Sequence, residues 1–598
     1  MKRTHRMPFG AEVGPNGVRF ALWAPDAGAV ELLIEGEAPQ PMIPAEGGWF
    51  RLDAPQVAAG AAYRFRVDGG LAVPDPASRG QLDDVHGPSL VVDAGAFEWE
   101  DSAWGGRPWE EAVFYELHVG TFTRGGTFEA AIARLDELVD LGVTAIELMP
   151  VADFPGRRGW GYDGVLPFAP DRAYGGPDDL KRLVQAAHRR GLMIFLDVVY
   201  NHFGPDGNYL NAYAKRFFTD RHHTPWGDAI NFDGPGCETV RDFFIHNALY
   251  WLNEYHFDGL RLDAVHAILD AGEVHFLDEL AARLRAALGR GRHVHLVLEN
   301  DDNAARFLGP DRFDAQWNDD AHHVLHALST GEDGGYYEDY RDDRGERLGR
   351  VLTEGFDYQG APSPHRGGAR RGERSDHLPA TAFVNFLQNH DQIGNRALGE
   401  RIGHLAQPEA LRAATAVLLL APSPPLLFMG QEWAAAQPFL YFCDFADALA
   451  DAVREGRRRE FAAFPAFRDA KARERIPDPN GALTFETCKL NWADRNVEPH
   501  RAWLSFHRQL LYLRRTEIVP RLAGMAAGGE ARAIGPHATV AAWRLGDGCR
   551  LRLRANLGAA PAAEAGTLGG RLLFATARVP GETMPPWYAE WTIEGENA

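Results

Sequence analysis

Apolar runs and helical segments alternate along the middle of the chain, from Glu111 onward. The runs EAVFYELHVG, VTAIELMPV and LMIFLDVVYNH have the length and residue types of buried strands. Between them, TFEAAIARLDELVDLG and GPDDLKRLVQAAHRRG carry apolar residues at helical spacing. In the second of these helices Pro177 lies in the first turn and Gly191 follows the last turn, as helix start and stop signals do. This alternation predicts parallel β/α units.

The same alternation continues until eight strands have been counted. The helices CETVRDFFIHNALYWLNEYH and EVHFLDELAARLRAAL precede the strands FDGLRLDAVH and HVHLVLEND, and FDAQWND, TAFVNFLQNHD and PLLFMGQEW supply three more. Eight parallel strands with intervening helices predict an α/β fold, a (β/α)8 TIM barrel with insertions, which we place at residues 101–520. The alternative is a doubly wound open sheet. It is disfavoured because no Gly-rich phosphate loop follows a strand.

Two stretches of β-type sequence flank the barrel. Residues 1–100 contain short apolar runs, such as GVRFALWAP and AYRFRVDG, between Gly, Pro and Asp turns, and predict an N-terminal β-sandwich module. Residues 521–598 return to this texture and predict a small C-terminal β-sandwich domain. Within the barrel, residues 203–236 and 331–376 are long and aperiodic. We expect them to build a binding cleft, with disorder as the alternative for the Arg-rich piece 366–374.

The composition limits the partners and the compartment. A formal net charge of -21 and a pI near 5.5 argue against nucleic acid and anionic membranes, which both require a basic surface. No apolar run reaches signal-peptide or membrane-spanning length, so we expect a cytoplasmic protein. The four cysteines are far apart and form no CxxC pair, which gives a disulfide framework or a zinc site little support.

Polar residues interrupt the apolar strands where those strands end. In FDGLRLDAVH, Arg261 and Asp263 lie two residues apart, so both charges point to one face of an extended chain. Because desolvation offsets much of the attraction in a buried ion pair, the pair suggests a carboxylate kept ionised for chemistry, with a purely structural pair as the alternative. In a TIM barrel these strand ends surround the active site. Their polar residues are Asp197, Asn201, His202, Arg261, Asp263, Glu299, Asn389, His390, Asp391 and Glu432.

Several kinds of chemistry use clustered carboxylates. A metal site is disfavoured because the strands carry no HExxH or His-x-His pair and because Arg261 beside Asp263 would repel a cation. Serine or cysteine catalysis is weaker, since no GxSxG elbow occurs. Cleavage of a glycosidic bond fits better because it needs one ionised and one protonated carboxyl group. Arg261 favours the charged form of Asp263, whereas Glu299, which ends the apolar run HLVLE, is expected in surroundings that favour protonation.

Four of these segments resemble the signature segments of the α-amylase superfamily of glycoside hydrolases. DVVYNH, GLRLDAVH, the Glu of LVLEND and FLQNHD occur in that superfamily's order on strands three, four, five and seven. The N-terminal module, with Trp23, Ala24 and Pro25, resembles the starch-module-like domain of branching, debranching and trehalose-releasing members. Three further segments are similar to the trehalose-releasing members: GRRGWGYDGVLPFAPDRAYGGPDDL, AQWNDDAHHVLHALSTGEDGGYYEDY and LFMGQEWAAAQPFLYF.

The resemblance implies a role for each matching position. Asp263 would be the nucleophile of a retaining hydrolase, Glu299 the acid and then the base, and Asp391 the third carboxylate that supports the distorted sugar. His202, His390 and Tyr162 would bind the sugar in subsite -1, with Arg261 keeping Asp263 charged. Asn201 and Arg261 are also expected among the substrate-binding residues, although Asn201 is linked to calcium in many amylases. Because the rest of such a calcium site is not recognisable, we expect no required metal and no cofactor.

The resemblance also implies the substrate: hydrolysis of the α-1,4 bond next to the terminal trehalose of maltooligosyltrehalose, giving trehalose and a shorter maltooligosaccharide. The acceptor side of the cleft must then recognise a disaccharide without a free reducing end. Our candidates for that recognition are Trp226, His266, Trp317, Asn318 and Asp319. Two alternatives stay open: a glycogen branching or debranching enzyme of the same superfamily, and a non-catalytic glucan-binding protein.

Overall fold

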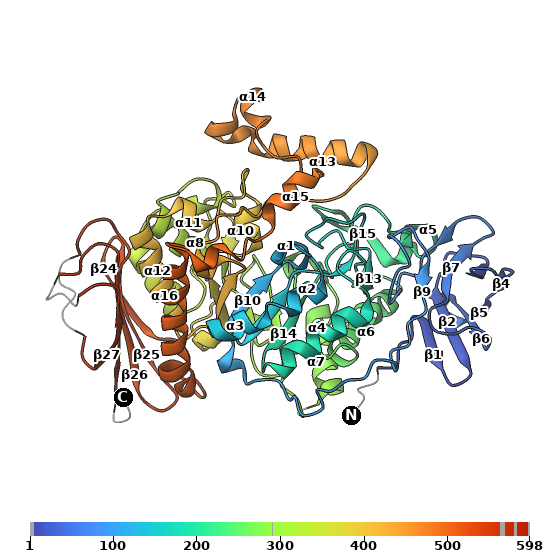
Figure 1. Ribbon diagram of the computed structural model, residues 1–598, viewed down its shortest axis with the longest axis horizontal. Helices are drawn as coiled ribbons and strands as arrows, with labels where there is room; N and C mark the ends of the chain where they lie inside the picture. Colours follow the sequence, from blue (N-terminus) through green and yellow to red (C-terminus); the bar gives the residue numbers. More distant parts are fainter. Residues whose placement is uncertain (1–4, 290, 563–567, 579–582, 596–598) are drawn as a thin grey trace.

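Eight parallel strands close into a barrel in the computed structural model, which describes residues 5–289, 291–562, 568–578 and 583–595 (Figure 1). The last strand pairs with the first, so the predicted (β/α)8 fold is confirmed. The barrel strands are β10 (Phe114–Leu117), β11 (Ala145–Leu148), β14 (Met193–Val198), β17 (Gly259–Leu262), β18 (His295–Leu298), β19 (Ala315–Trp317), β22 (Phe383–Phe386) and β23 (Pro425–Phe428).

The barrel interior changes from apolar to charged along each strand. Phe195 and Val297 belong to the buried cluster that fills the barrel. Two residues beyond Phe195 on β14, the same inward face carries Asp197, which is in register with Arg261 on β17. Glu299 follows β18, two residues beyond Val297. The period of two therefore gathers the charged side chains at the carboxyl ends of the strands.

Helices surround the barrel (Figure 1). The helix predicted from Pro177 is α4 (Pro177–Arg189), and the long helices α6 (Cys237–Asn253) and α7 (Phe276–Leu288) also lie at predicted positions. The long helix α12 (Pro408–Leu420) precedes the last barrel strand. The single helix predicted over 127–142 is instead two, α2 (Phe128–Ile132) and α3 (Leu135–Leu141). Among the described residues, no helix is long and apolar enough to cross a membrane.

The N-terminal module consists of two antiparallel sheets, as the strand pattern predicted. It packs on the barrel through aromatic side chains, for example Phe9 against Phe243 of α6 with ring centres 5.3 Å apart. One sheet contains β1 (Gly10–Gly14), β2 (Gly17–Trp23), β6 (Trp49–Ala54) and β5 (Ile43–Ala45). The other contains β4 (Gln40–Pro41), β3 (Val30–Ile34), β7 (Ala62–Val67) and β8 (Ala72–Val73), with β9 (Ser89–Leu90) paired to β7.

The C-terminal domain differs in detail from the predicted sandwich. Its described residues form one five-stranded antiparallel sheet, which uses barrel helices in place of a second sheet. Trp543 Nε1 donates to the carbonyl of Leu352 in α9 (Arg344–Thr353), and Trp591 Nε1 donates to that of Ala416 in α12. The strands are β24 (Glu530–Gly535), β25 (Ala538–Arg544), β26 (Arg550–Asn556), β28 (Tyr588–Glu594) and β27 (Arg571–Ala575).

The two long insertions are structured. Residues 203–236 contain the hairpin β15 (Phe218–Thr224) and β16 (Gly227–Ile230). Residues 331–376 include α9, although the sequence showed no periodicity there. The Arg-rich piece is not disordered, because Arg371 lies 3.0 Å from Asp301 and 2.9 Å from Asp320, which ties it to the ends of neighbouring strands. A further segment with α13 (Asp447–Glu460) and α14 (Ala470–Arg473) projects beyond the barrel (Figure 1).

Candidate active site

Arg261 lies at the centre of the carboxyl end of the barrel and contacts three carboxylates. Its Nη1 lies 2.7 Å from Asp197 Oδ2 and 3.0 Å from Asp263 Oδ1, and its Nη2 lies 2.9 Å from Glu299 Oε2. The guanidinium is fully buried, with Cζ 4.1 Å from the centre of the Trp317 ring. The sequence predicted a pair with Asp263 alone. One planar cation instead serves acids from three adjacent strands.

Asp263 is fixed through both carboxylate oxygens. Arg261 holds Oδ1, and Asn201 Nδ2 donates to Oδ2 and to the backbone carbonyl of Asp263, both at 2.8 Å. These bonds set the rotation of the carboxylate, and 11% of the side chain stays accessible. Asn201 itself is only 2% exposed. Its expected role as a substrate contact is therefore corrected: the amide lies behind Asp263 and positions it.

Glu299 is held by the backbone that follows Asp263. Ala264 has φ +40° in the left-handed region, and its N–H donates to Glu299 Oε2 at 2.8 Å. A non-glycine residue in this region carries a conformational cost, which active sites often retain. The surroundings of Glu299 are not the apolar ones that the sequence predicted. In this structure the carboxyl group shares the Arg261 cation with Asp263, so Arg261 does not distinguish the two acids.

Asp197 and Tyr162 form the wall beside Arg261. Burial raises the pKa of Asp197 to about 7, although the Arg261 charge opposes the rise. Tyr162 donates its hydroxyl to Asp197 Oδ2 at 2.7 Å, and its ring stacks on His390 with centres 5.0 Å apart. Tyr162 remains half-buried. One face of its ring is thereby covered by His390, and its hydroxyl is committed to Asp197.

His390 and Asp391 begin the short helix α10 (His390–Gly394), whose first turn is capped by Asn389. His390 Nδ1 lies 2.5 Å from Glu116 Oε1, and Nε2 lies 3.5 Å from Asp391 Oδ1. Burial alone would lower the pKa of His390, but the charges of Asp391 and Glu116 raise it to about 9. The imidazole is therefore protonated at neutral pH. The Asp391 side chain is 35% exposed. Partial burial raises the pKa of its carboxyl group, although the charge of His390 opposes the rise.

Three predicted acceptor-side residues lie within reach of solvent. Trp226, at the turn between β15 and β16, is 49% exposed and stacks flat on His202, with ring centres 4.6 Å apart and planes at 7°. His266 and Asp319 are half-buried. Burial and the charge of Glu299 raise the pKa of Asp319 well above its usual value, which places this carboxyl group in the electrostatic surroundings of the catalytic end.

Two other predicted acceptor residues do not face the cleft. Trp317 is 1% exposed because its side chain points into the barrel beneath Arg261. Asn318 is fully buried, and its Nδ2 donates to Asn385 Oδ1 at 3.0 Å and to the Gly355 carbonyl at 2.9 Å. Both acceptor assignments were wrong. Arg261 is likewise buried, so its part in the site is to position the acids and not to touch a sugar.

Two acids of the site were missed in the sequence. Glu116 on β10 binds His390. Glu147 on β11 lies beside Glu116 in the barrel interior. Neither oxygen of Glu147 accepts a hydrogen bond from the described residues, and burial, reinforced by the Glu116 charge, raises its pKa well above the usual value. Each is a single acid inside an apolar strand, in FYELHV and AIELMP. That is the pattern which had singled out Arg261.

Three family models match the chain. The alpha amylase catalytic domain matches residues 99–247, and carbohydrate-binding module 48, the isoamylase N-terminal domain, matches residues 8–78. A domain of unknown function matches residues 526–591. The first match contains Tyr162, Asp197 and His202 but ends before Asp263. Asp263, Glu299 and Asp391 all lie outside this match.

Relatives extend the likeness over most of the chain. Malto-oligosyltrehalose trehalohydrolase of Deinococcus radiodurans is 46% identical over 85% of this chain and 82% of its own length. The protein of the same name from Saccharolobus solfataricus is 40% identical over 85% of this chain and 87% of its own. The chain belongs to the malto-oligosyltrehalose trehalohydrolase family. It is a glycoside hydrolase, and neither the branching or debranching alternative nor the non-catalytic one is favoured.

Solved structures share the family's architecture. A crystal structure from Salmonella typhimurium that carries the name alpha amylase superposes with a TM-score of 0.93 at 44% identity, covering 99% of this chain and all of that one. Pullulanase from Paenibacillus barengoltzii reaches a TM-score of 0.71 at 20% identity over 98% of this chain, a likeness in fold alone.

Proposed function

We propose that this chain hydrolyses the α-1,4 bond next to the terminal trehalose of maltooligosyltrehalose and releases trehalose and a maltooligosaccharide. The main structural support is the contact of one buried cation, Arg261, with Asp263 and Glu299. It brings together the two carboxyl groups that glycoside cleavage requires. The relatives' name supports the substrate.

Asp263 is the proposed nucleophile. Its carboxylate attacks C1 of the sugar at the cleavage point, and the bond from C1 to the leaving oxygen breaks as the glycosyl-enzyme bond forms. Arg261 and Asn201 fix both carboxylate oxygens, so the attacking group is oriented before the substrate arrives. The leaving group is the trehalose unit.

Glu299 is the proposed acid and base. Its Oε2 accepts the Ala264 N–H and contacts Arg261, whereas Oε1 has no protein partner among the described residues. The proton is therefore carried on Oε1, from which it passes to the leaving oxygen. The carboxylate then takes a proton from water, which attacks C1 and frees Asp263.

The donor sugar is held by His390, Asp391 and Tyr162. His390, protonated and fixed by Glu116, can donate a charge-assisted hydrogen bond to a sugar hydroxyl. Asp391, partly exposed beside it, can accept from neighbouring hydroxyls as the ring distorts. Tyr162 supplies an aromatic surface next to both. We assign these three residues to subsite -1.

Trp226 and His202 form an aromatic platform on the rim of the site. We assign its exposed member Trp226, together with Asp319 and His266, to recognition of the trehalose end, and we keep His202 in subsite -1. The stacked pair presents a rigid, half-exposed surface suited to the apolar face of a sugar ring. A half-buried carboxyl group such as Asp319 disfavours ligands that leave it without a hydroxyl partner.

Product analysis tests the proposed function. The wild-type protein is incubated separately with maltopentaosyl trehalose and with glycogen, and the sugars released are separated by anion-exchange chromatography. We expect trehalose and maltopentaose from the first substrate and little change in the second. Release of linear chains from glycogen, or new branch points, without trehalose from the first substrate would overturn the proposal in favour of a debranching or branching enzyme.

A further inference from the structure

A cavity of about 200 Å³ lies between the N-terminal module and the barrel. Its walls include Glu12 of β1, Phe97 and Trp99 from the segment that joins the module to the barrel, and Glu254 at the end of α6. Glu254 precedes β17, so the cavity lies at the amino ends of the barrel strands. The catalytic carboxylates lie at the opposite, carboxyl ends.

Several charged atoms around this cavity are buried and have no hydrogen-bond partner among the described residues. The Glu254 side chain is 4% exposed, and neither of its oxygens accepts a hydrogen bond from the described residues. Lys181, fully buried, lies 3.8 Å from Glu254 Oε1, too far for a direct hydrogen bond. Arg79 donates to Glu12 Oε2 at 2.5 Å, but its Nε has no partner in the described part of the chain. Buried polar groups of this kind normally have partners.

Burial disfavours the charged forms of these groups. It raises the pKa of Glu254, against the attraction of Arg79 and Lys181, and it lowers the pKa of Lys181. Burial also lowers the pKa of His5, at the edge of the cavity, to about 3, so that this imidazole is neutral. A ligand that supplies hydrogen bonds to these groups would remove part of their desolvation cost.

The mixture of charges favours a neutral ligand rich in hydroxyl groups. An anion would meet Glu254 and Asp93, whereas a cation would meet Arg79. A hydroxyl group can donate to a carboxylate and accept from a guanidinium at the same time. Phe97 and Trp99, with ring centres 4.8 Å apart, add aromatic surface suited to the apolar face of a sugar.

We propose that this cavity binds one neutral pyranose ring, either free glucose or the end ring of a glucan, at a site separate from the active site. The ring would contact β1 of the N-terminal module and the end of α6 in the barrel together. Trp99 already stacks on His256 of the barrel, with ring centres 3.8 Å apart. The bound sugar would accordingly tie the module more firmly to the barrel.

Hydrogen exchange on the full chain, read by mass spectrometry, tests this proposal. Glucose and maltoheptaose are titrated separately, and betaine at equal concentration controls for solvent effects. We expect glucose to slow exchange in residues 10–14, 93–99 and 250–255, whether or not it also protects the active-site segments. A response to maltoheptaose but not to glucose would identify the end of a glucan as the source of the ring.

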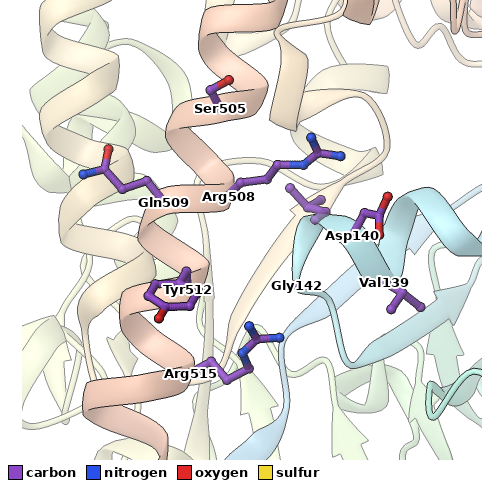
Figure 2. Close-up of a pocket in the computed structure, with 9 residues that line it drawn as sticks. Val139, Asp140, Gly142, Ser505, Arg508, Gln509, Tyr512 and Arg515 are labelled. Atoms are coloured by element: carbon purple, nitrogen blue, oxygen red, sulfur yellow. The ribbon is translucent and has the colours of Figure 1, made fainter.

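Two variants remove contacts to the bound ring. Glu254→Gln and Phe97→Ala should weaken the glucose-dependent protection at least tenfold while trehalose release stays close to wild type. The control variant is Tyr512→Ala, in a groove between α3 and α16 (His500–Leu513) (Figure 2). The polar side chains of this groove, Ser505, Gln509, Tyr512 and Arg515, are exposed. This variant should retain the glucose response.

Two results would overturn the proposal. The first is that neither glucose nor maltoheptaose changes exchange in these three segments more than betaine does, which would mean that the cavity holds water only. The second is equal protection in Glu254→Gln and wild type, which would contradict the assigned contacts.

Discussion

The backbone N–H of Ala264 donates to Glu299 Oε2 at 2.8 Å, and Ala264 adopts φ +40° to do so. This bond joins the residue after the proposed nucleophile to the proposed acid on the next strand. The left-handed conformation costs an L-residue about 1–2 kcal/mol. The acid and the nucleophile are thus held relative to each other by backbone as well as by Arg261.

The conformation of Ala264 gives a direct prediction. Ala264→Gly should leave kcat close to wild type and change the free energy of unfolding by no more than about 1 kcal/mol, because glycine adopts this φ without strain. Ala264→Val should destabilise the protein by about 1–3 kcal/mol, because a β-branched side chain is poorly accommodated there. Urea unfolding and initial rates provide the measurements. A Val variant as stable and active as the Gly variant would contradict this account.

The three catalytic carboxylates can be removed without changing side-chain volume. Asp263→Asn, Glu299→Gln and Asp391→Asn should each lower kcat by several orders of magnitude while unfolding stays cooperative. Glu432→Gln is the matched control, because Glu432 is a buried acid bound to Tyr115 outside the cluster. Any of the three that keeps more than about a tenth of wild-type kcat, a loss under about 1.4 kcal/mol, has no place in the mechanism.

The barrel was predictable because strand burial follows a simple period. Alternating strands and helices fixed the architecture, and the spacing of Arg261 and Asp263 placed both charges on the inner face. The helix α4 was found from Pro177 and Gly191 because local signals dictate its ends. Such features depend on residues near in sequence.

The site residues that were misjudged depend on contacts between distant strands. Trp317 ends β19 and Asn318 follows it, so both lie at a strand end as the cleft residues do. Arg261 covers Trp317, however, and Asn385 and Gly355 bind Asn318. Glu299 ends an apolar run, yet its neighbour in space is a cation from another strand. Sequence spacing gives the direction of a side chain and not the partner that it meets.

The pKa of His390 predicts a loss of stability at alkaline pH. The pKa of a free histidine is about 6.5. In the folded protein Asp391 and Glu116 favour the charged form of His390 and raise its pKa to about 9. This raised pKa adds to the free energy of unfolding. The added stability is fully present below about pH 6.5 and is lost as the pH rises through about 9. Urea unfolding across this range should show a decline in the wild type that His390→Gln lacks. Parallel curves would contradict the assignment.

The acceptor platform predicts selectivity. Trp226→Ala and Asp319→Asn should lower kcat/KM for maltooligosyltrehalose much more than for plain maltooligosaccharides, because only the first substrate places trehalose against these residues. Tyr512→Ala, which removes an aromatic side chain 57% exposed on the outside of the barrel, is the matched control and should change neither. If the two cleft variants lose both activities in equal proportion, these residues serve folding or the donor side.

Release of trehalose and the configuration of the new reducing end can be followed in one reaction. Wild-type protein and maltopentaosyl trehalose are followed by proton NMR from the first minutes of reaction, before the anomers equilibrate. A nucleophile at Asp263 and an acid at Glu299 require carboxyl groups about 5–5.5 Å apart and two inversions at C1. We predict that free trehalose and the α-anomer of maltopentaose appear together at equal rates. The β-anomer appearing first, or maltopentaose without trehalose, would contradict the account.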